Sequence, residues 1–595
     1  MQRKWRIAAH DMGHVDSLRR ATQLPAIVAQ LLLERGIDSP DAAEAFLNPK
    51  LTDLRDPSEL PDIDRACHLI SEAIATNKQI MIHGDYDADG ITGTAILFRC
   101  LKLMGGNVNY YIPNRLQDGY GLKGKAIEQF AKDGVSLIIT VDCGIASISE
   151  ADTVKQLGMQ LIVTDHHQLG DSLPNAAAII HPGLPDHPYP FAGLAGAGVA
   201  FKLAWALCQN KSGSKRVTPQ LRTFLLQAVG LAAIGTVADM VPLLDENRAL
   251  VIHGLTSILQ RPVPGLAELM KITKLSPKKE LISEDIGFTI APRLNAAGRL
   301  GQAMLAVELL ISDDDSRVAS LADYLHQLNK SRESLERSVY LAANKQATEA
   351  LDAGWEGALV LSAHGWHPGV IGIVAGRLVE KFHCPVLLVS LDETGVKPGL
   401  GSARSIPGFN IADGLSACRE HLLSHGGHAA AAGFQVDPHK LDSFRSDFCE
   451  YACEHIQKED GQSDLKINAE VPFSGLTLQA VEQIERLQPF GQGNRRPLFC
   501  TSQIELASAP KTIGGGGRHL SMELMQHGIR LRGVAFGRGH WAEDLANAEG
   551  MLSFAFRPVI NSFRGQRNVE LHVEDWQDQA TAAISDEAKS MSRIH

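Results

Sequence analysis

Apolar runs of strand length alternate with helical segments through the N-terminal half of this 595-residue chain. The runs are Gln79–His83, Val108–Ile112, Leu137–Val141, Leu161–Thr164 and Ala177–Ile180. Helical stretches separate several of them; Thr92–Met104 is one, and Gly105-Gly106 ends it. Strands joined through helices pair in parallel, so the pattern predicts βαβ units and a mostly parallel sheet with both faces covered.

Three further regions differ from this pattern. Residues 1 to about 60 predict short helices, one of which starts after Leu24-Pro25 and ends at Gly36. Ser312 and the three aspartates after it open a long amphipathic helix, which is either a bundle helix or a rigid connector between two lobes. From residue 354 a smaller α/β lobe begins, with a strand at Ala358–Ser362, a helix at Gly369–Lys381 and a strand at Pro385–Ser390.

Beyond Leu465 the chain changes character again. Short runs rich in glycine and arginine (Arg530–Phe536, Leu552–Arg557, Asn561–Leu571) indicate a small antiparallel barrel. The predicted fold is therefore α/β: a parallel-sheet lobe joined by a long helix to a second, smaller α/β lobe, plus a C-terminal β-barrel. The expected boundaries are 1–60 (helical segment), 61–300 (parallel-sheet lobe), 301–353 (long helix), 354–464 (second lobe), 465–578 (barrel) and 579–595 (flexible tail).

Net charge, cysteine content and the length of apolar segments exclude several classes of protein. The formal net charge of −11 argues against a purely electrostatic nucleic-acid binder, although it allows a locally basic groove. Nine scattered cysteines without a CxxC pair argue against a zinc site and suit a reducing cytoplasm. The N-terminus has no apolar segment of signal-peptide length, and the longest apolar run, near Val229–Leu244, is broken by Asp239. We therefore expect a cytoplasmic protein without membrane insertion.

The strongest chemical signal is His83-Gly84-Asp85-Tyr86-Asp87-Ala88-Asp89-Gly90, directly after a predicted strand. Three carboxylates at alternating positions repel one another unless cations intervene. A polar turn resembling a calcium loop is the alternative, but no glutamate follows at the EF-hand position.

Similar residues follow other apolar runs. Asp142 follows Leu137–Val141, the Asp165-His166-His167 triplet follows Leu161–Thr164, and Asp239 follows a run that we also interpret as a strand. Ligands bind at the carboxyl ends of strands in an open parallel sheet, so these side chains can converge. Carboxylates with imidazole suit manganese or magnesium, and this many ligands can hold two ions.

The segments HGDYDADG, VDCG, TDHH and ADMVP, in this order, resemble the motifs of the DHH phosphoesterase superfamily. With PRLNAAGR (Pro292–Arg299), GSARSIPGFN (Gly401–Asn410), HGGHAAAAG (His425–Gly433) and the barrel, the chain is similar to the bacterial single-strand-specific exonucleases of that superfamily, from about residue 20 to 575. The resemblance implies a DHH domain, a DHHA1-like substrate-binding domain and an OB-fold.

The resemblance also implies roles for residues of the first lobe. Asp87, Asp89, Asp142, His166 and Asp239 would be metal ligands, with Asp142 bridging two divalent ions, and His83 matches a further ligand position. Asp85 would bind metal or orient a water, Asp165 would orient imidazole, and His167 would contact phosphate or donate a proton.

Other residues would bind the substrate. Arg299 could stabilise charge in the transition state, and Asn295 lies in the same motif. The remaining candidates are Ser402, Arg404, Ser405, Gly426, Gly427 and His428. In the barrel, arginines 518, 530, 532, 557, 564 and 567 and phenylalanines 536, 554 and 563 offer cations and stacking faces, although strand alternation would bury some of the aromatic residues.

The implied function is a single-stranded-DNA-specific 5′→3′ exonuclease that releases nucleoside 5′-monophosphates by a two-metal mechanism in DNA repair and recombination. The implied state is a monomer assisted by a single-strand-binding protein and a helicase. Two alternatives stay open. One is an oligoribonuclease or small-nucleotide phosphodiesterase of the same superfamily, and the other is a non-catalytic DNA-binding scaffold.

Overall fold

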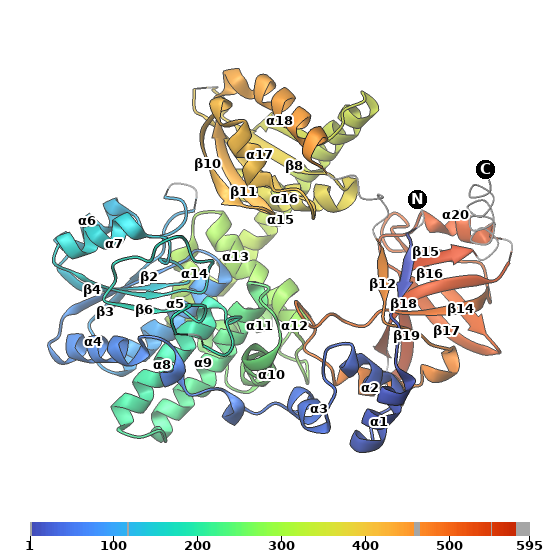
Figure 1. The fold of residues 1–595 in the computed structure, drawn as a ribbon, viewed down its shortest axis with the longest axis horizontal. Coiled ribbons are helices and arrows are strands. Elements are labelled where there is room, and N and C mark those ends of the chain that lie inside the picture. The colour runs from blue at the N-terminus through green and yellow to red at the C-terminus, as the bar shows by residue number, and fades with distance from the viewer. Residues whose placement is uncertain are drawn as a thin grey trace. The chain divides into compact units, whose positions relative to one another are not determined.

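The computed structural model describes residues 3–115, 118–187, 189–394, 396–456, 464–548, 550–563 and 565–578, so the expected tail at 579–595 lies outside the described residues. The chain forms two compact units (Figure 1). The larger comprises Leu51–Pro242 and Glu246–Glu459, and the smaller comprises Met1–Lys50, Leu243–Asp245 and Asp460–His595.

The first sheet of the larger unit is parallel throughout, as predicted, in the order β3-β2-β4-β5-β6. Its strands are β2 (Gln79–Gly84), β3 (Val108–Tyr111), β4 (Val135–Val141), β5 (Gln160–Thr164) and β6 (Ala178–Ile180). Helices α6 (Gly124–Lys132) and α7 (Ile148–Gln156) cover one face, and α4 (Ile63–Ala75), α5 (Ala88–Leu103) and α8 (Gly196–Ser212) cover the other (Figure 1). The strands are consequently buried on both sides.

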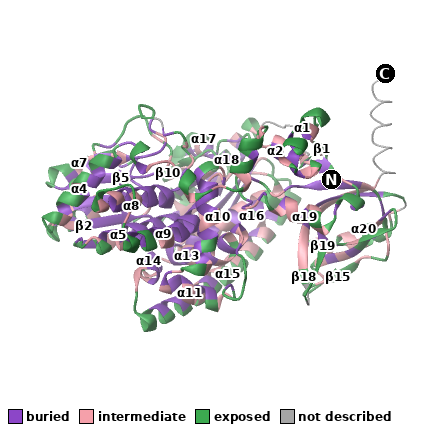
Figure 2. Ribbon diagram, turned by 90° about the horizontal axis from the view of Figure 1, so that it is seen from below, coloured by how far each residue is buried: buried purple, intermediate pink, exposed green. Residues whose placement is uncertain are grey.

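The apolar run before Asp239 is a helix, which corrects our interpretation of it as a strand. Helix α9 (Pro219–Ala238) has 20 residues, and Asp239 is its C-cap. A run that is apolar on every side does not distinguish a buried helix from a buried strand. By length and composition α9 could cross a membrane, but 67% of its most apolar window is buried inside the unit, as in a core helix (Figure 2).

A helical layer continues from α9 to the second lobe. It contains α10 (Asp245–Gln260), α11 (Pro264–Ile272), α12 (Ser283–Asp285), a π-helical turn at Ile286–Ile290, α13 (Ala291–Arg299) and α14 (Ala303–Ile311). The predicted long helix is α15 (Asp315–Asp352), capped by Asp314, whose carboxylate accepts the amides of Ser316 and Arg317. It contacts α11, α13 and α14, and its later residues Val339, Ala343 and Ala347 pack in the core of the second lobe. It therefore joins the two lobes.

The second lobe has a mixed sheet in the order β10-β11-β9-β8-β7. Strands β7 (Leu359–His364) and β8 (Val386–Leu391) are parallel, whereas β9 (Gly399–Arg404), β10 (Leu422–His428) and β11 (Ala431–Val436) add antiparallel pairs. Its helices are α16 (Pro368–Phe382), α17 (Ile411–Ala417) and α18 (Leu441–His455).

The smaller unit contains the barrel. Its main strands are β14 (Phe499–Leu506), β16 (His519–Gln526), β17 (Ile529–Ala535), β18 (Leu552–Phe563) and β19 (Gln566–Asp578), joined by the short β13 (Ala469–Glu470) and β15 (Lys511–Ile513). Most pairs are antiparallel, but β17–β19 and β13–β14 are parallel, which corrects the expectation of a purely antiparallel barrel. Helices α19 (Leu478–Glu485) and α20 (Trp541–Ala546) complete it.

The N-terminal residues fold with the barrel. Helices α1 (Met12–Thr22), α2 (Ala26–Leu33) and α3 (Pro40–Leu47) match the predicted short helices, and α2 residues Val28 and Leu31 share one core with Phe499 and Phe554. A strand that the sequence did not reveal, β1 (Trp5–Ile7), pairs in parallel with β12 (Leu465–Ile467).

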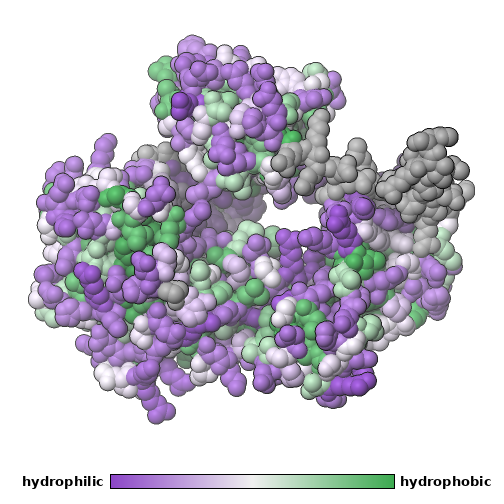
Figure 3. All heavy atoms as spheres, viewed as in Figure 1, coloured by the Kyte–Doolittle hydropathy of each residue, from purple (hydrophilic) through white to green (hydrophobic). Residues whose placement is uncertain are grey.

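Polar side chains dominate the visible surface, with small apolar areas between them (Figure 3).

Candidate active site

The acidic loop after β2 is held by two helix N-termini. Asp87 is the N-cap of α5, and its Oδ1 accepts the amides of Asp89 (2.9 Å) and Gly90 (3.1 Å). Asp89 accepts the amides of Gly196 (2.7 Å) and Ala197 (2.9 Å) at the start of α8. The positive ends of both helices therefore favour carboxylates here.

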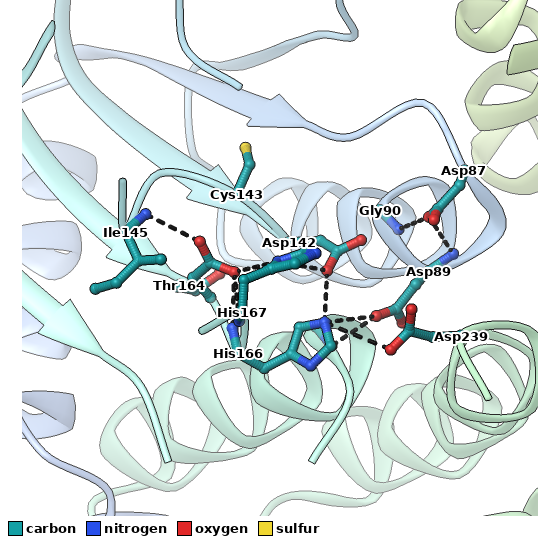
Figure 4. A network of polar contacts seen from close by, with 12 residues as sticks. Asp87, Asp89, Gly90, Asp142, Cys143, Ile145, Thr164, His166, His167 and Asp239 are labelled. Atoms are coloured by element: carbon teal, nitrogen blue, oxygen red, sulfur yellow. Dashed lines mark hydrogen bonds and ion pairs between the residues drawn. The ribbon is translucent and has the colours of Figure 1, made fainter. Parts of the chain in front are cut away.

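His166 lies at the centre of the acidic cluster (Figure 4). Its Nε2 is 3.0 Å from Oδ1 of Asp142, 3.5 Å from Oδ2 of Asp239 and 3.7 Å from Oδ2 of Asp89. Asp142 adopts φ +62°, and a Cβ on Gly196 would lie 2.5 Å from its Oδ1, so α8 can approach only because that residue is glycine.

The potential ligand atoms form three overlapping groups, and within each group they lie within 4.8 Å of one another. The groups are Asp89 with His166 and Asp239, Asp142 with His166 and His167, and Asp85 with Asp87 and Asp142. Asp142 and His166 each belong to two groups. The predicted convergence is therefore present, including Asp239, which arrives from the end of a helix.

The electrostatics of the cluster disfavour its charged state. Burial, followed by the charge of Asp87, raises the pKa of Asp89 to about 7. Burial and the charges of Asp89 and Asp87 raise the pKa of Asp239 to about 8, and burial with four neighbouring carboxylates raises that of Asp142 well above its ordinary value. Burial lowers the pKa of His166 to about 4.

These residues fit divalent cations. Oδ1 of Asp85, Oδ1 of Asp142 and Nε2 of His166 are buried and make no hydrogen bond among the described residues, although the last two atoms lie 3.0 Å apart. Buried polar atoms without partners are rare, and carboxylates with one or two imidazoles are the donor set of manganese and magnesium. The cluster can therefore hold such ions.

Asp165 and Tyr120 contact the ring of His167 and fix its orientation. Its Nδ1 lies 2.7 Å from Oδ1 of Asp165, which also accepts the backbone amides of His166 and His167. Burial by itself lowers the pKa of His167, but the hydrogen bond and charge of Asp165 outweigh it and raise the pKa to about 9. The Tyr120 hydroxyl lies 3.1 Å from the same Nδ1 and donates to the carbonyl of Asp142. The side chain is 40% exposed, so it can meet a substrate.

His83 is not a member of these three groups. The side chain is fully buried, its Nδ1 lies 3.7 Å from Sγ of Cys143, and its ring packs against Tyr111 and Phe130. Burial lowers its pKa to about 4, and its Nε2 has no partner among the described residues. None of the ligand groups found among the described residues contains it.

Arginines gather beside the acidic loop. Burial and then the charges of Arg115, Arg332 and Arg404 lower the pKa of Arg299 to about 10. Arg299 donates to the carbonyl of Gly369 at 3.4 Å, next to the start of α16. The guanidinium of Arg115 stacks 4.8 Å from the ring centroid of Tyr86. Several buried or stacked guanidinium groups in one place suit a phosphate-bearing ligand.

Asn295 has a local partner. Its Oδ1 accepts the amide of Ala88 at 2.8 Å, so its carboxamide oxygen fixes the acidic loop to α13. The neighbouring residue Arg299 belongs to the arginine group above.

The candidates of the second lobe separate into two sets. Nη1 of Arg404 donates to Oγ of Ser402 and to the carbonyl of Ala403, and Gly372 of α16 leaves the space that this guanidinium occupies. Ser405 instead donates to the carbonyl of Phe409 in its own loop. Gly426, Gly427 and His428 lie exposed on the edge strand β10.

The barrel residues proposed to contact nucleic acid also fall into two sets, one exposed and the other buried or ion-paired. Phe554 is fully buried, whereas Phe536 is exposed between His519 and His572. Arg532, Arg557 and Arg567 form ion pairs with glutamates, and Arg518 is exposed. Arg564 and the side chain of Phe563 lie outside the described residues.

Sequence reasoning missed Arg115 and Tyr120. Both lie in the loop that follows the strand at Val108–Tyr111. Polar residues that follow a parallel strand lie at the edge of the sheet where Asp142 and Asp165 lie. The position of Arg115 and Tyr120 after such a strand was therefore a signal, although neither is a carboxylate or an imidazole.

Three family models match this chain in order. They are the DHH family, N-terminal domain (residues 79–231), the DHHA1 domain (356–454) and the RecJ OB domain (467–575). The single-stranded-DNA-specific exonuclease RecJ of Bacillus subtilis is 37% identical over 574 residues, which cover 96% of this chain and 70% of that protein. The protein of the same name from Dickeya dadantii is 35% identical, covering 93% of this chain and 96% of its own length.

Solved structures of RecJ proteins match the fold of this chain as well. The crystal structure of RecJ from Thermus thermophilus in complex with Mn²⁺ matches with a TM-score of 0.80 and 32% identity, covering 96% of this chain and 79% of that one. A manganese-bound exonuclease RecJ structure matches with a TM-score of 0.59 and 37% identity, covering 68% of this chain and 98% of that one. Because the two lobes and the barrel all match in sequence and in fold, this chain belongs to the RecJ family of the DHH superfamily.

Proposed function

We propose that this chain is a metal-dependent exonuclease that degrades single-stranded DNA from the 5′ end, releases nucleoside 5′-monophosphates and acts in DNA repair and recombination. One observation carries the proposal: a buried carboxylate–imidazole cluster with unpartnered ligand atoms lies beside a group of arginines. The substrate class is supported by the relatives, which are called single-stranded-DNA-specific exonucleases.

In this proposal Asp87, Asp89, Asp142, His166 and Asp239 hold two manganese or magnesium ions. When bound, such ions supply polarisation of the scissile phosphodiester and activation of water. Asp85 orients the water or binds metal through its unpartnered oxygen, and His83 remains a candidate ligand through its buried Nε2.

His167 contacts the scissile phosphate or donates a proton to the leaving oxygen. Its Nδ1 is held by Asp165, so Nε2 is the atom that can face the substrate. Tyr120 limits the rotation of the same ring.

The arginines would bind phosphates of the strand. Arg299 and Arg404 each feel the charge of Arg115, so the three lie near one another, and Arg299 feels the charge of Asp87 in the acidic loop. A terminal 5′ phosphate held here would place the adjoining phosphodiester at the ions, and the 5′→3′ polarity itself rests on the family resemblance. Ser402 supports Arg404, and Ser405, Gly426, Gly427 and His428 are proposed as further contacts.

We also propose that the chain works as a monomer in the cytoplasm, together with a single-strand-binding protein and a helicase. These assignments rest on the family resemblance.

Release of labelled mononucleotides tests the proposal. With Mn²⁺, single-stranded DNA labelled at the 5′ end should yield labelled mononucleotide at once, whereas 3′-labelled strands should shorten progressively. Asp142→Ala should lose this activity, while Asp133→Ala, which removes a carboxylate elsewhere in the same lobe, should retain it. Equal cleavage of duplex DNA, or faster cleavage of short RNA, would replace the proposal with a duplex nuclease or an oligoribonuclease.

A further inference from the structure

Asn247 connects two backbone segments that carry residues of the metal cluster. It is fully buried near the start of α10, and its Nδ2 donates to the carbonyl of Gly193 (2.5 Å) and to that of Pro242 (3.0 Å). Gly193 lies three positions before Gly196, the first residue of α8. Pro242 lies three positions after Asp239. One carboxamide therefore joins the segment that leads into α8 to the turn that follows α9.

The two joined segments hold different carboxylates of the cluster (Figure 4). The amides of Gly196 and Ala197 bind Asp89, whereas Asp239 is the C-cap of α9. Asp89 and Asp239 form one ligand group with His166. The separation of the two carboxylates consequently depends on where α8 begins relative to where α9 ends.

The turn after α9 depends on backbone contacts. Met240 adopts φ +59°, a conformation that costs energy for a residue other than glycine, and its side chain is 72% exposed. An exposed side chain contributes little packing, so the hydrogen bond from Asn247 to the carbonyl of Pro242 helps to hold the turn.

The preceding residue, Glu246, holds Asn247 against α8. Its buried carboxylate accepts hydrogen bonds from Nζ of Lys202 on α8 (2.5 Å), the hydroxyl of Tyr189 (2.5 Å) and the amide of Arg55 (2.8 Å). A side chain can position other groups only if its own backbone is fixed. Glu246 meets this requirement for Asn247.

The Asn247 side chain is buried at a cost. Its Oδ1 makes no hydrogen bond among the described residues, and an unpaired buried acceptor costs about 1–3 kcal/mol. Reversing the amide would place Oδ1 against two carbonyl oxygens, so the two bonds of Nδ2 fix its orientation. Those two bonds are what a polar side chain contributes at this position.

We propose that Asn247 is a positioning residue of the metal centre. It sets the separation of Asp89 and Asp239 through the backbone segments that carry them, and so it tunes the affinity for the ions. It touches neither the ions nor the strand. The inference deepens the proposed function, since it rests on the metal site assigned there.

Mn²⁺ binding to the full chain tests the inference, with free Mn²⁺ measured by electron paramagnetic resonance in the absence of DNA. Asn247→Leu keeps the approximate size of the side chain and removes both donors. It should raise the Kd for Mn²⁺ about 10–100-fold and lower kcat, while KM for single-stranded DNA stays within about twofold. In EDTA, amide hydrogen exchange at residues 193–197 should be faster than in the parent.

A second variant and a matched control complete the experiment. Asn247→Ser keeps one donor and should raise the Kd in the same direction by a smaller factor. Ser257 lies buried on the same helix, α10, and its hydroxyl donates to the carbonyl of Leu226 on α9 (2.5 Å). Ser257→Ala loosens the same pair of helices, yet its Kd for Mn²⁺ should stay within about twofold of the parent. Circular dichroism checks that each variant is folded.

The inference is overturned if the Asn247 variants bind Mn²⁺ as tightly as the parent, or if Ser257→Ala weakens binding as much as they do. A rise in KM with an unchanged Kd for Mn²⁺ would overturn it as well. Mn²⁺ binding and hydrogen exchange are measured without DNA, so a parent that binds Mn²⁺ but degrades no single strand would overturn the proposed function and leave this inference to the binding data.

Discussion

Asp142→Asn is expected to make the metal-free protein more stable and to remove most of its stabilisation by metal. Asp142 is 1% exposed, and burial followed by the charges of Asp89, Asp87, Asp85 and Asp239 raises its pKa well above 3.8. The new amide cannot ionise, so the variant loses the carboxylate whose charged state burial and the neighbouring aspartates disfavour.

The magnitude follows from proton linkage. An acid whose pKa is raised by folding destabilises the fold at every pH above its unfolded pKa. The cost grows by about 1.4 kcal/mol per pH unit until the folded pKa is reached. Counted from the ordinary value of 3.8, Asp142 costs at most about 4 kcal/mol at pH 7. We therefore expect a metal-free gain of about 2–4 kcal/mol at pH 7 that shrinks toward zero near pH 4.

Thermal denaturation in EDTA between pH 5 and 8, repeated with Mn²⁺, measures both effects. In EDTA the variant should melt higher than the parent, and the difference should widen with pH. An ion present at 100 times its Kd adds about 2.7 kcal/mol to the parent, and the variant should gain far less. A variant that is less stable in EDTA at pH 7, or one that Mn²⁺ stabilises as strongly as the parent, would refute the reasoning.

Three further changes test other parts of the larger unit. Lys202→Met should destabilise it by about 3–5 kcal/mol in urea unfolding, because the buried Glu246 loses its main counter-charge, and adding Glu246→Gln should recover part of this loss. An unchanged midpoint would contradict the buried pair. Asp165→Asn should lower kcat about 10–100-fold while Mn²⁺-induced stabilisation persists, because His167 loses the carboxylate charge that orients its ring and raises its pKa. A loss of metal binding instead would make Asp165 part of the metal site. Arg404→Ala should raise KM about tenfold or more for 5′-phosphorylated strands, with little change for 5′-hydroxyl strands in steady-state assays. An equal change for both would remove the terminal-phosphate assignment.

The sequence by itself determined the features that depend on local chemistry. Alternating apolar runs predicted that β2 to β6 are parallel. Helices join β2, β3, β4 and β5, as parallel pairing requires, whereas β6 follows β5 after a loop that contains no helix. The shared direction of the strands predicted that Asp87, Asp142 and His166 would lie at one edge of the sheet, where the structure brings them together. The cap at Asp314 and the regular apolar spacing after it predicted α15.

Only the tertiary structure decided which distant segments meet. Asp239 reaches His166 from the end of α9, Arg115 comes near Arg299 although 184 positions separate their numbers, and β1 pairs with a strand some 460 residues later. His83 has the same ligand chemistry as His166, yet its ring packs against Tyr111 and Phe130 and belongs to none of the ligand groups among the described residues. Periodicity and capping act within a few residues, whereas contact and burial depend on how whole elements pack, so no local pattern could have specified these placements.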